Sequence, residues 1–181
     1  PSGDVTVVVP LAGDCPHRTA AWAHIRARWE REHPTWPITI GECPTPWRKA
    51  VAVKDGVRKA RTPIVIVTDA DVWTPGITAA VEAIRSGRAA IAQPHCRFAR
   101  LTPEATSRVL AGELDLDTAH QDPVNLLERP YRQVLAGGVL VLTTEAARAI
   151  PGDPRFIGWG GQDISWGIAL TTVFGRAHRG R

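Results

Sequence analysis

Short runs of aliphatic and β-branched residues alternate with amphipathic stretches along the first half of the chain. Runs such as VTVVVP and PIVIVT predict strands at 5–10, 38–43, 63–68 and 89–93. Between them, apolar residues at helical spacing predict helices at 19–33, 47–60 and 77–86. This alternation is typical of a parallel sheet built from βαβ units with right-handed crossovers.

The second half of the chain is less regular. Four prolines interrupt the stretch from 94 to about 133, and its weak periodicity predicts an irregular excursion. A strand is then predicted at 137–143 and helices at 144–150 and 161–173. The predicted fold class is α/β: one domain over 1–181 with an open, mostly parallel sheet between helices. Its 1–93 half is Rossmann-like, and a ligand is expected beyond the carboxyl ends of the strands.

Composition narrows the class of protein. With 181 residues, 44% hydrophobic and 22% charged, the chain is long enough and apolar enough for a folded core. No apolar run approaches the roughly 20 residues of a membrane span, so no membrane partner is expected. Three scattered cysteines favour a cytoplasmic protein with reduced thiols. The excess of Arg over Lys, with abundant Ala, suggests a GC-rich genome, as in a bacterial or phage-infected cell.

The net charge of +4 is concentrated at the two ends of the chain, and the segment 93–135 carries a net charge of −1. A general nucleic-acid binder usually shows an uninterrupted basic face, which the sequence lacks. The distribution favours a small anionic ligand held by the N-terminal part.

Two motifs carry candidate chemistry. Asp69-Ala70-Asp71 follows the strongest predicted strand directly, and two carboxylates there suit a hard cation such as Mn²⁺ or Mg²⁺. The plainer interpretation is a solvated strand end. In Gly158-Trp159-Gly160-Gly161-Gln162-Asp163, three glycines permit close backbone approach to a ligand, and Asp163 follows at a helix start. Its plainer interpretation is a glycine turn with Asp163 as the cap.

Taken together and in this order, the two motifs resemble those of GT-A-fold glycosyltransferases of the galactosyltransferase type. The matching pattern is a strand-end DxD, a GG-strand and then FxGWGG(E/Q)D, here from Phe156 to Asp163. The segment 47–56 resembles the family's FNRAxxLNxG helix, and Pro10 with Arg18 resembles its nucleotide loop less closely. The resemblance implies a GT-A-type sheet, with nucleotide-sugar binding in 1–93 and acceptor binding and catalysis in 94–181.

The resemblance also implies roles for individual residues. Asp163 matches the catalytic base that deprotonates the acceptor hydroxyl in an inverting transfer. The metal ligands would be Asp71, Asp69 and His178, with Mn²⁺ or Mg²⁺ as the cofactor. The implied donor-binding residues are Pro10, Arg18, Glu42, Lys49, Asp69, Gly138, Trp159 and Gly160. The implied acceptor-side residues are Gly161, Gln162, Tyr131 and Arg132.

The sequence departs from the family at Gln162, where the family has an acid, and at Lys54, where it has asparagine. The expected donor is a UDP-hexose, and the donor sugar stays open. The acceptor is open among saccharide, protein, small molecule and modified DNA, the last as in a bacteriophage enzyme. A non-catalytic nucleotide-sugar-binding module is the alternative. A nucleotidyltransferase is less favoured, because 11–15 lacks a glycine-rich basic loop. His95, Arg97 and Arg100 follow the fourth predicted strand, in a solvated loop or at the acceptor cleft.

Overall fold

The computed structural model describes residues 3–12, 15–132, 135–158 and 160–180, and these form two compact units. Unit 1 comprises residues up to His95 and from 134 onward, and unit 2 is Cys96–Gln133. Unit 1 contains strands β1 (Val5–Pro10), β2 (Ile38–Gly41), β3 (Ile64–Thr68), β4 (Ile91–Gln93), β7 (Val139–Thr143) and β8 (His178–Arg179). Its helices are α1 (Pro16–Glu32), α2 (Lys49–Lys59), α3 (Ile77–Arg85), α5 (Thr144–Ala149) and α6 (Gln162–Phe174).

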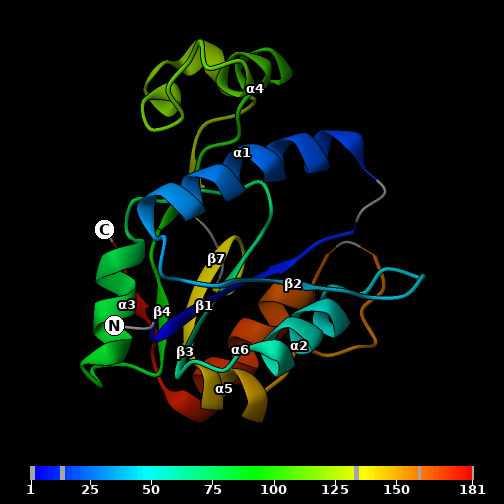
Figure 1. Cartoon of the computed structure of the whole chain (residues 1–181), viewed down its shortest axis with the longest axis vertical. Coiled ribbons are helices and arrows are strands. Elements are labelled where there is room, and N and C mark those ends of the chain that lie inside the picture. The colour runs from blue at the N-terminus through cyan, green and yellow to red at the C-terminus, as the bar shows by residue number, and fades with distance from the viewer. Residues whose placement is uncertain (1–2, 13–14, 133–134, 159, 181) are drawn as a thin grey trace. The chain divides into compact units, whose positions relative to one another are not determined.

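The strands of unit 1 form one sheet in the order β2-β1-β3-β7-β4-β8. Pairing is parallel between β1 and its two neighbours and between β4 and β8, whereas β7 is antiparallel to both β3 and β4. Only β7 therefore runs against the others, which confirms the mostly parallel sheet. The carboxyl ends of β1, β2 and β3 meet at the edge where Asp69 and Asp71 follow β3 (Figure 1).

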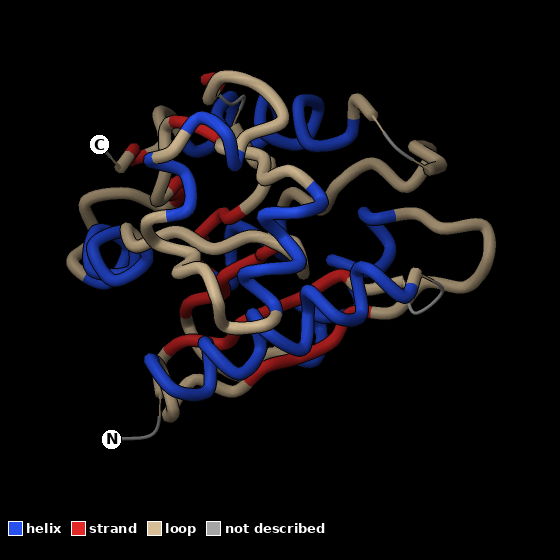
Figure 2. Tube along the Cα trace, turned by 90° about the horizontal axis from the view of Figure 1, so that it is seen from above, coloured by secondary structure: helices blue, strands red, loops and turns tan. Residues whose placement is uncertain are grey.

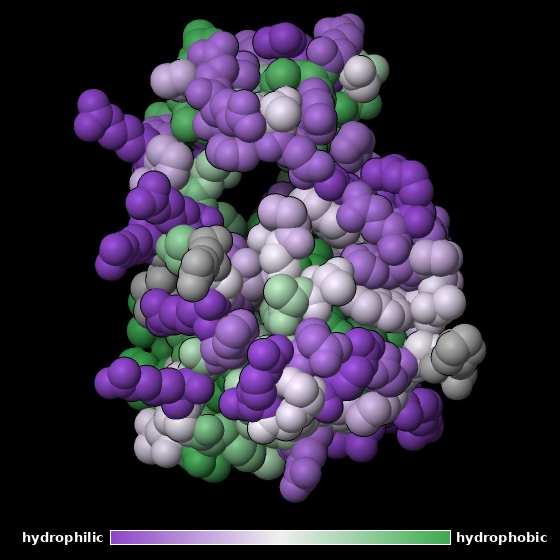
Figure 3. Space-filling view, turned by 90° about the vertical axis from the view of Figure 1, so that its left-hand side faces the viewer, coloured by the Kyte–Doolittle hydropathy of each residue, from purple (hydrophilic) through white to green (hydrophobic). Residues whose placement is uncertain are grey.

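Helices cover both faces of this sheet (Figures 1 and 2). Alternate strand residues pack with α2, α5 and α6 into one hydrophobic core cluster, because successive side chains of a strand point to opposite faces. Examples from three elements are Val67, Val53 and Trp166. On the face shown in Figure 3, hydrophilic side chains predominate, since the apolar runs of the sequence are used in the core.

Two details of unit 1 differ from the sequence prediction. Helix α1 begins at Pro16 rather than at 19, because proline at the first helical turn has its φ already set for the helix. The short strand β8 was not predicted at all, since two residues carry no periodicity. No helix among the described residues combines the length and the apolarity that crossing a bilayer requires.

Unit 2 is inserted between β4 and β7 and has its own secondary structure. A two-stranded antiparallel ribbon pairs β5 (Arg97–Phe98) with β6 (Tyr131–Arg132). Between these strands lie α4 (Pro103–Leu110) and two short 3-10 helices at Ala119–Gln121 and Pro123–Asn125. The side chain of Thr102 caps α4 by accepting a hydrogen bond from the backbone N–H of Ala105 at 3.1 Å. The segment 94–133, which its four prolines led us to predict as irregular, thus contains a helix.

Candidate active site

Three side chains from separate elements meet at the carboxyl edge of the parallel strands. Lys49 stands at the first position of α2, Asp69 follows β3, and Asp163 lies in the first turn of α6. The Lys49 ammonium is 2.7 Å from Asp69 Oδ1 and 3.0 Å from Asp163 Oδ1. It also donates a hydrogen bond to Asp163 Oδ2 at 3.2 Å. One buried ammonium therefore bridges the strand-end carboxylate and the helix carboxylate.

The glycine loop before α6 explains how Asp163 reaches this position. Gly161, the residue before α6, has a φ of 72°, and a Cβ there would lie 2.9 Å from the Phe156 ring. A side chain at this position is thus excluded both by backbone conformation and by space. The N–H of Gly158 donates to the carbonyl oxygen of Trp47 at 3.0 Å, which joins the loop to the start of α2. The segments carrying Lys49 and Asp163 are held together by this contact.

The charges of the cluster shift the pKa values of its members. Burial raises the pKa of the Asp163 carboxyl above its ordinary value, and the nearby Asp69 charge adds to the effect against the opposing ammonium of Lys49. Burial alone would lower the pKa of Lys49, but the carboxylates of Asp69 and Asp163 outweigh it, and that pKa is raised. Lys49 therefore stays charged near neutral pH, while Asp163 is a stronger base than an exposed aspartate.

The second carboxylate of the DxD motif has a different environment. Asp71 Oδ2 lies 3.6 Å from Nε of Arg18 in the first turns of α1, and the Asp71 side chain is 41% exposed. The contact is long for an ion pair, so Asp71 keeps oxygen atoms open to another partner. A short stretch later, Trp73 packs edge-on against the buried Trp29 of α1 with ring centroids 4.9 Å apart. Helix α1 thus holds the loop after β3 at two points.

Backbone contacts also join the loop after β3 to the start of β7. The N–H of Asp69 donates to the carbonyl oxygen of Gly138 at 2.8 Å, so Gly138 lies beside the carboxylate cluster, and Gly138 itself has a φ of 75°. Nearby, Nε2 of the buried His95 accepts a hydrogen bond from the N–H of Val139 at 3.3 Å. His95 is therefore a buried residue of unit 1 that joins the end of β4 to β7, rather than part of a solvated loop.

The other residues predicted to bind the donor or acceptor make fewer contacts with the carboxylate cluster. Pro10 is buried at the end of β1, opposite Gly41 of β2. Glu42 follows β2 and is exposed, and its N–H donates to Asp55 Oδ2 at 3.1 Å. Gly160 is exposed with a φ of 107°, and Trp159 lies outside the described residues. Gln162 of the acceptor-side set is buried, 6% exposed, in the first turn of α6.

The three predicted metal ligands are not gathered into one group. His178 lies exposed on β8, three strand positions from β3, which corresponds to roughly 14 Å at the usual strand spacing. Among the residues that the structure describes, no three His, Cys, Asp or Glu side chains are grouped so that they could hold a metal ion. The predicted acceptor-side residues Tyr131 and Arg132 belong to unit 2.

The bridging position of Lys49 was not predicted from the sequence. The residue was singled out as a donor-side cation, but its two acidic partners lie 20 and 114 positions further along the chain. Only the strand order brings the three residues together, because α2 and α6 both begin at the edge of the sheet where β3 ends. Sequence spacing alone gives no such juxtaposition.

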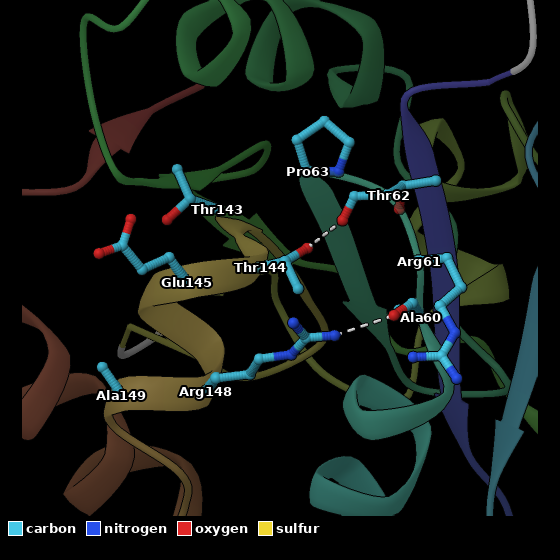
Figure 4. A pocket seen from close by; sticks show the side chains of 9 residues that line it. All are labelled: Ala60, Arg61, Thr62, Pro63, Thr143, Thr144, Glu145, Arg148 and Ala149. Carbon is cyan, nitrogen blue, oxygen red and sulfur yellow. Dashed lines mark hydrogen bonds between the residues drawn. The ribbon is translucent and has the colours of Figure 1, made fainter.

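A hollow of about 950 Å³ lies elsewhere on unit 1, at the start of β3 and the end of β7 (Figure 4). Two of the polar side chains that line it are engaged with backbone carbonyls. The Thr144 hydroxyl donates to the carbonyl oxygen of Thr62 at 2.6 Å, and Arg148 donates to that of Ala60 at 2.9 Å. With these groups engaged, and Asp69 following the other end of β3, the hollow is not the candidate site.

Comparison with solved structures places the fold. A point mutant of Drosophila β1,4-galactosyltransferase 7, in complex with manganese, UDP-Gal and xylobiose, matches with a TM-score of 0.54 at 11% identity, over 98% of this chain and 64% of that one. The mannosyltransferase PcManGT from Pyrobaculum calidifontis, in complex with GDP-Man and Mn²⁺, matches with a TM-score of 0.53 at 19% identity, over 97% and 54%. The bifunctional IspDF from Campylobacter jejuni matches with a TM-score of 0.50 at 11% identity, over 98% and 49%.

These matches give the chain a GT-A-type fold, as the sequence predicted, and at such low identity they show the fold alone. The chain spans about half to two thirds of the length of the structures it matches. No protein-family model matches the sequence, and no curated protein matches it.

Proposed function

We propose that this chain is a glycosyltransferase that moves a sugar from a nucleotide-sugar donor to an acceptor hydroxyl with inversion, using a divalent cation. The observation that carries the proposal is the Lys49 bridge between Asp69 and Asp163. It joins the two motifs that the sequence offered for separate chemistry, a metal-side carboxylate and a base. A solvated strand end and a plain helix cap would have no reason to share one buried ammonium.

Asp163 is the base in this proposal. Its carboxylate is part-buried and its pKa is raised, and both properties suit a group that must accept a proton from a hydroxyl. The proton passes from the acceptor oxygen to Asp163, that oxygen forms the new bond to the anomeric carbon, and the bond to the nucleoside diphosphate breaks. Lys49 keeps Asp163 ionised and oriented, and its charge lies on the side where the diphosphate is expected.

The chemistry of the strand edge fits a hard divalent cation. Asp71 keeps carboxylate oxygens exposed, and such cations are commonly held by one or two carboxylates together with substrate phosphates and water. Asp71 would be the main protein ligand, with Asp69 beside it, and His178 stays a predicted ligand. When bound, the cation would neutralise charge on the departing diphosphate. Both similar transferases were solved in complex with manganese and a nucleotide sugar.

The donor would extend from the carboxylate cluster along the ends of β1 and β2. Arg18, whose guanidinium lies beside Asp71, would contact a phosphate or the ribose, and Pro10 and Glu42 lie at the ends of β1 and β2. A UDP-hexose is the proposed donor. The acceptor could be a saccharide, a protein, a small molecule or modified DNA.

The first experiment measures thermal stability with UDP in the presence of Mn²⁺ or of EDTA. At 100 times its dissociation constant, a ligand adds about 2.7 kcal/mol of stability, which is about 5–10 °C for a chain of this size. We expect that increment only with Mn²⁺, and we expect Asp71→Ala to abolish it. The matched control Asp153→Ala removes a carboxylate paired with Arg155 and should leave the increment unchanged.

A panel of UDP- and GDP-hexoses, tested for slow hydrolysis, then identifies the donor. Hydrolysis that needs Mn²⁺ and is lost in Asp71→Ala supports a transferase. A chain that is stabilised by the donor but never hydrolyses it would instead be a binding module. If UDP stabilises the chain equally in EDTA, the metal dependence proposed here is wrong.

A further inference from the structure

Unit 2 carries a concentration of arginine and aromatic side chains on its two-stranded ribbon. The sequence reads Arg97-Phe98-Ala99-Arg100 on one side and Arg129-Pro130-Tyr131-Arg132 on the other. The register pairs Arg97 with Arg132 and Phe98 with Tyr131. Two short segments, 28 residues apart in the sequence, thus bring four arginines and two rings together.

The charge of unit 2 is strongly segregated. The two segments that carry the ribbon, 96–100 and 128–132, contain one acid in the sequence, Glu128, which lies 3.4 Å from Arg100. The intervening segment 101–127 contains five acidic residues and one arginine. The net charge of −1 found for the middle of the chain therefore conceals a basic ribbon beside an acidic helical part. The sequence argument against a polyanionic partner does not apply to the ribbon itself.

The arginine pair is unfavourable for the protein alone. Like charges directly opposite each other on an antiparallel pair destabilise it. Both side chains are exposed, and among the described residues neither Arg97 nor Arg132 has an acidic partner. An oxyanion between two guanidinium groups would remove this repulsion and accept charge-assisted hydrogen bonds.

The next pair of residues offers a different chemistry. The rings of Phe98 and Tyr131 stack with centroids 5.9 Å apart and an angle of 21° between planes. The Arg100 guanidinium lies over the Tyr131 ring at 5.2 Å from its centroid. Because neighbouring residues of a strand point to opposite faces, the rings lie on one face of the ribbon and the Arg97–Arg132 pair on the other.

We propose that the β5–β6 ribbon binds a single-stranded nucleic acid, stacking bases on Phe98 and Tyr131 and placing backbone phosphates against Arg97 and Arg132. The ribbon has only two strands among the described residues, so its two faces are one backbone layer apart and meet along the outer edge of each strand. A nucleic-acid strand that passes along such an edge reaches the rings on one face and the arginines on the other. Single strands are bound by this combination of cationic side chains and aromatic platforms. Binding itself does not depend on the transfer proposed above. As a statement that the acceptor is a nucleic acid, it rests on that proposed function.

The test uses the full chain and a fluorescently labelled, mixed-sequence 12-nucleotide DNA, with binding measured by anisotropy at several salt concentrations. Arg132→Gln should weaken binding about tenfold or more and make the salt dependence shallower, by about 0.7 in logarithmic slope for one lost phosphate contact. Tyr131→Ala should weaken binding about fivefold or more without changing that slope, because stacking is not ionic. Arg108→Gln, which removes an exposed arginine of α4, is the matched control and should bind like the unaltered chain.

Stability measurements separate lost binding from lost folding. Arg132→Gln should preserve or raise the thermal midpoint, because it removes a like-charge pair, and Arg132→Glu should raise it further by pairing with Arg97. Absence of binding by the unaltered chain at 50 mM salt overturns the proposal. So does unaltered binding by both Arg132 variants, or equal competition by duplex DNA or by inorganic phosphate. Both the binding and the stability measurements are made without donor or metal, so their outcomes are independent of the transfer reaction.

Discussion

At the scale of single residues, the candidate site brings three charged side chains together at a partly buried position. Asp163 and Asp69 would repel each other if they were alone at a partly buried edge, and Lys49 makes their proximity tolerable. Burial raises the pKa of Asp163 against the opposing charge of Lys49, which makes its carboxylate a better proton acceptor than that of an exposed aspartate. Both properties agree with the role of base proposed for Asp163.

The residue-scale prediction concerns Asp163→Asn, which keeps the shape of the side chain and removes the base. Transfer should fall by about 10²–10⁴-fold, the usual contribution of general-base catalysis, while donor affinity stays within a few-fold. A carboxyl group acts as a base only when it is ionised, so the rate should rise as the pH rises through the pKa of Asp163. The low-pH limb of the rate profile should accordingly lie above pH 3.8 in the unaltered chain and vanish in the variant.

Turnover at saturating donor, measured from pH 4 to 8, checks this prediction. Asp153→Asn changes a half-buried aspartate that pairs with Arg155 ten positions earlier, and it should keep both the rate and the low-pH limb. Near-normal turnover of Asp163→Asn would mean that the base lies elsewhere. A capping role alone predicts that result, because asparagine caps a helix about as well as aspartate.

At the scale of elements, the site is fixed by where strands end and helices begin. Lys49, Asp69 and Asp163 each lie at an element boundary on one edge of the sheet. His95 stabilises this edge from within, because its Nε2 accepts the N–H of the first residue of β7. Burial lowers the pKa of His95 to about 4. The folded chain thus requires a neutral imidazole at this junction.

The element-scale prediction is an acid-sensitive stability that His95 causes. Between pH 6.5 and 4 the unfolded chain binds a proton at His95 that the folded chain does not, so stability must fall as pH falls through that window. The loss attributable to this residue is at most about 3 kcal/mol. Urea unfolding of His95→Gln at pH 4.5 and 7 should show a weaker pH dependence than the parent. His17→Gln, an exposed change on α1, should show the parental dependence.

Elements were predictable where the chain's pattern is long and regular, and not elsewhere. Apolar runs predicted β1, β3 and β7 within two residues of their observed ends, because buried strands need continuous aliphatic surface. The antiparallel direction of β7 was not predicted, since a run of buried residues reads the same in either direction. Helix α4 was missed although Thr102 and Pro103 gave an ordinary start signal.

The sequence predicted which residues belong to the candidate site better than it predicted which of them contact one another. Motif resemblance singled out Asp69, Asp71 and Asp163, but which cation each would meet depended on packing between distant segments. Lys49 bridges two carboxylates and Arg18 faces Asp71, and neither pairing follows from spacing. The ribbon of unit 2 was hidden for the same reason, because Arg97 and Arg132 become neighbours only through strand pairing.

At the scale of the whole molecule, the two units contain unequal shares of the buried apolar side chains. Every residue of the core cluster packed against α2, α5 and α6 lies outside 96–133. Among the described residues of unit 2, few apolar side chains are buried, and Ala105, Val109 and Ala119 are all small. The free energy of folding should therefore reside mainly in unit 1, and the donor-side residues belong to unit 1 as well. Unit 2 is then the part that can vary without loss of the fold.

The whole-molecule prediction replaces 97–132 with a six-residue Gly/Ser linker. The junction can close because the segment removed begins and ends with Arg97 and Arg132, which are paired across the ribbon. We expect the thermal midpoint to stay within a few degrees and the Mn²⁺-dependent stabilisation by UDP to persist, because neither rests on unit 2. Binding of the 12-nucleotide DNA should fall at least tenfold, because the arginines and rings of the ribbon are gone. Thermal melts with UDP and Mn²⁺, run beside anisotropy on the same preparation, check both halves. A folded chain that loses the UDP effect would show that the donor site needs unit 2, whereas one that keeps DNA binding would place the nucleic-acid surface on unit 1.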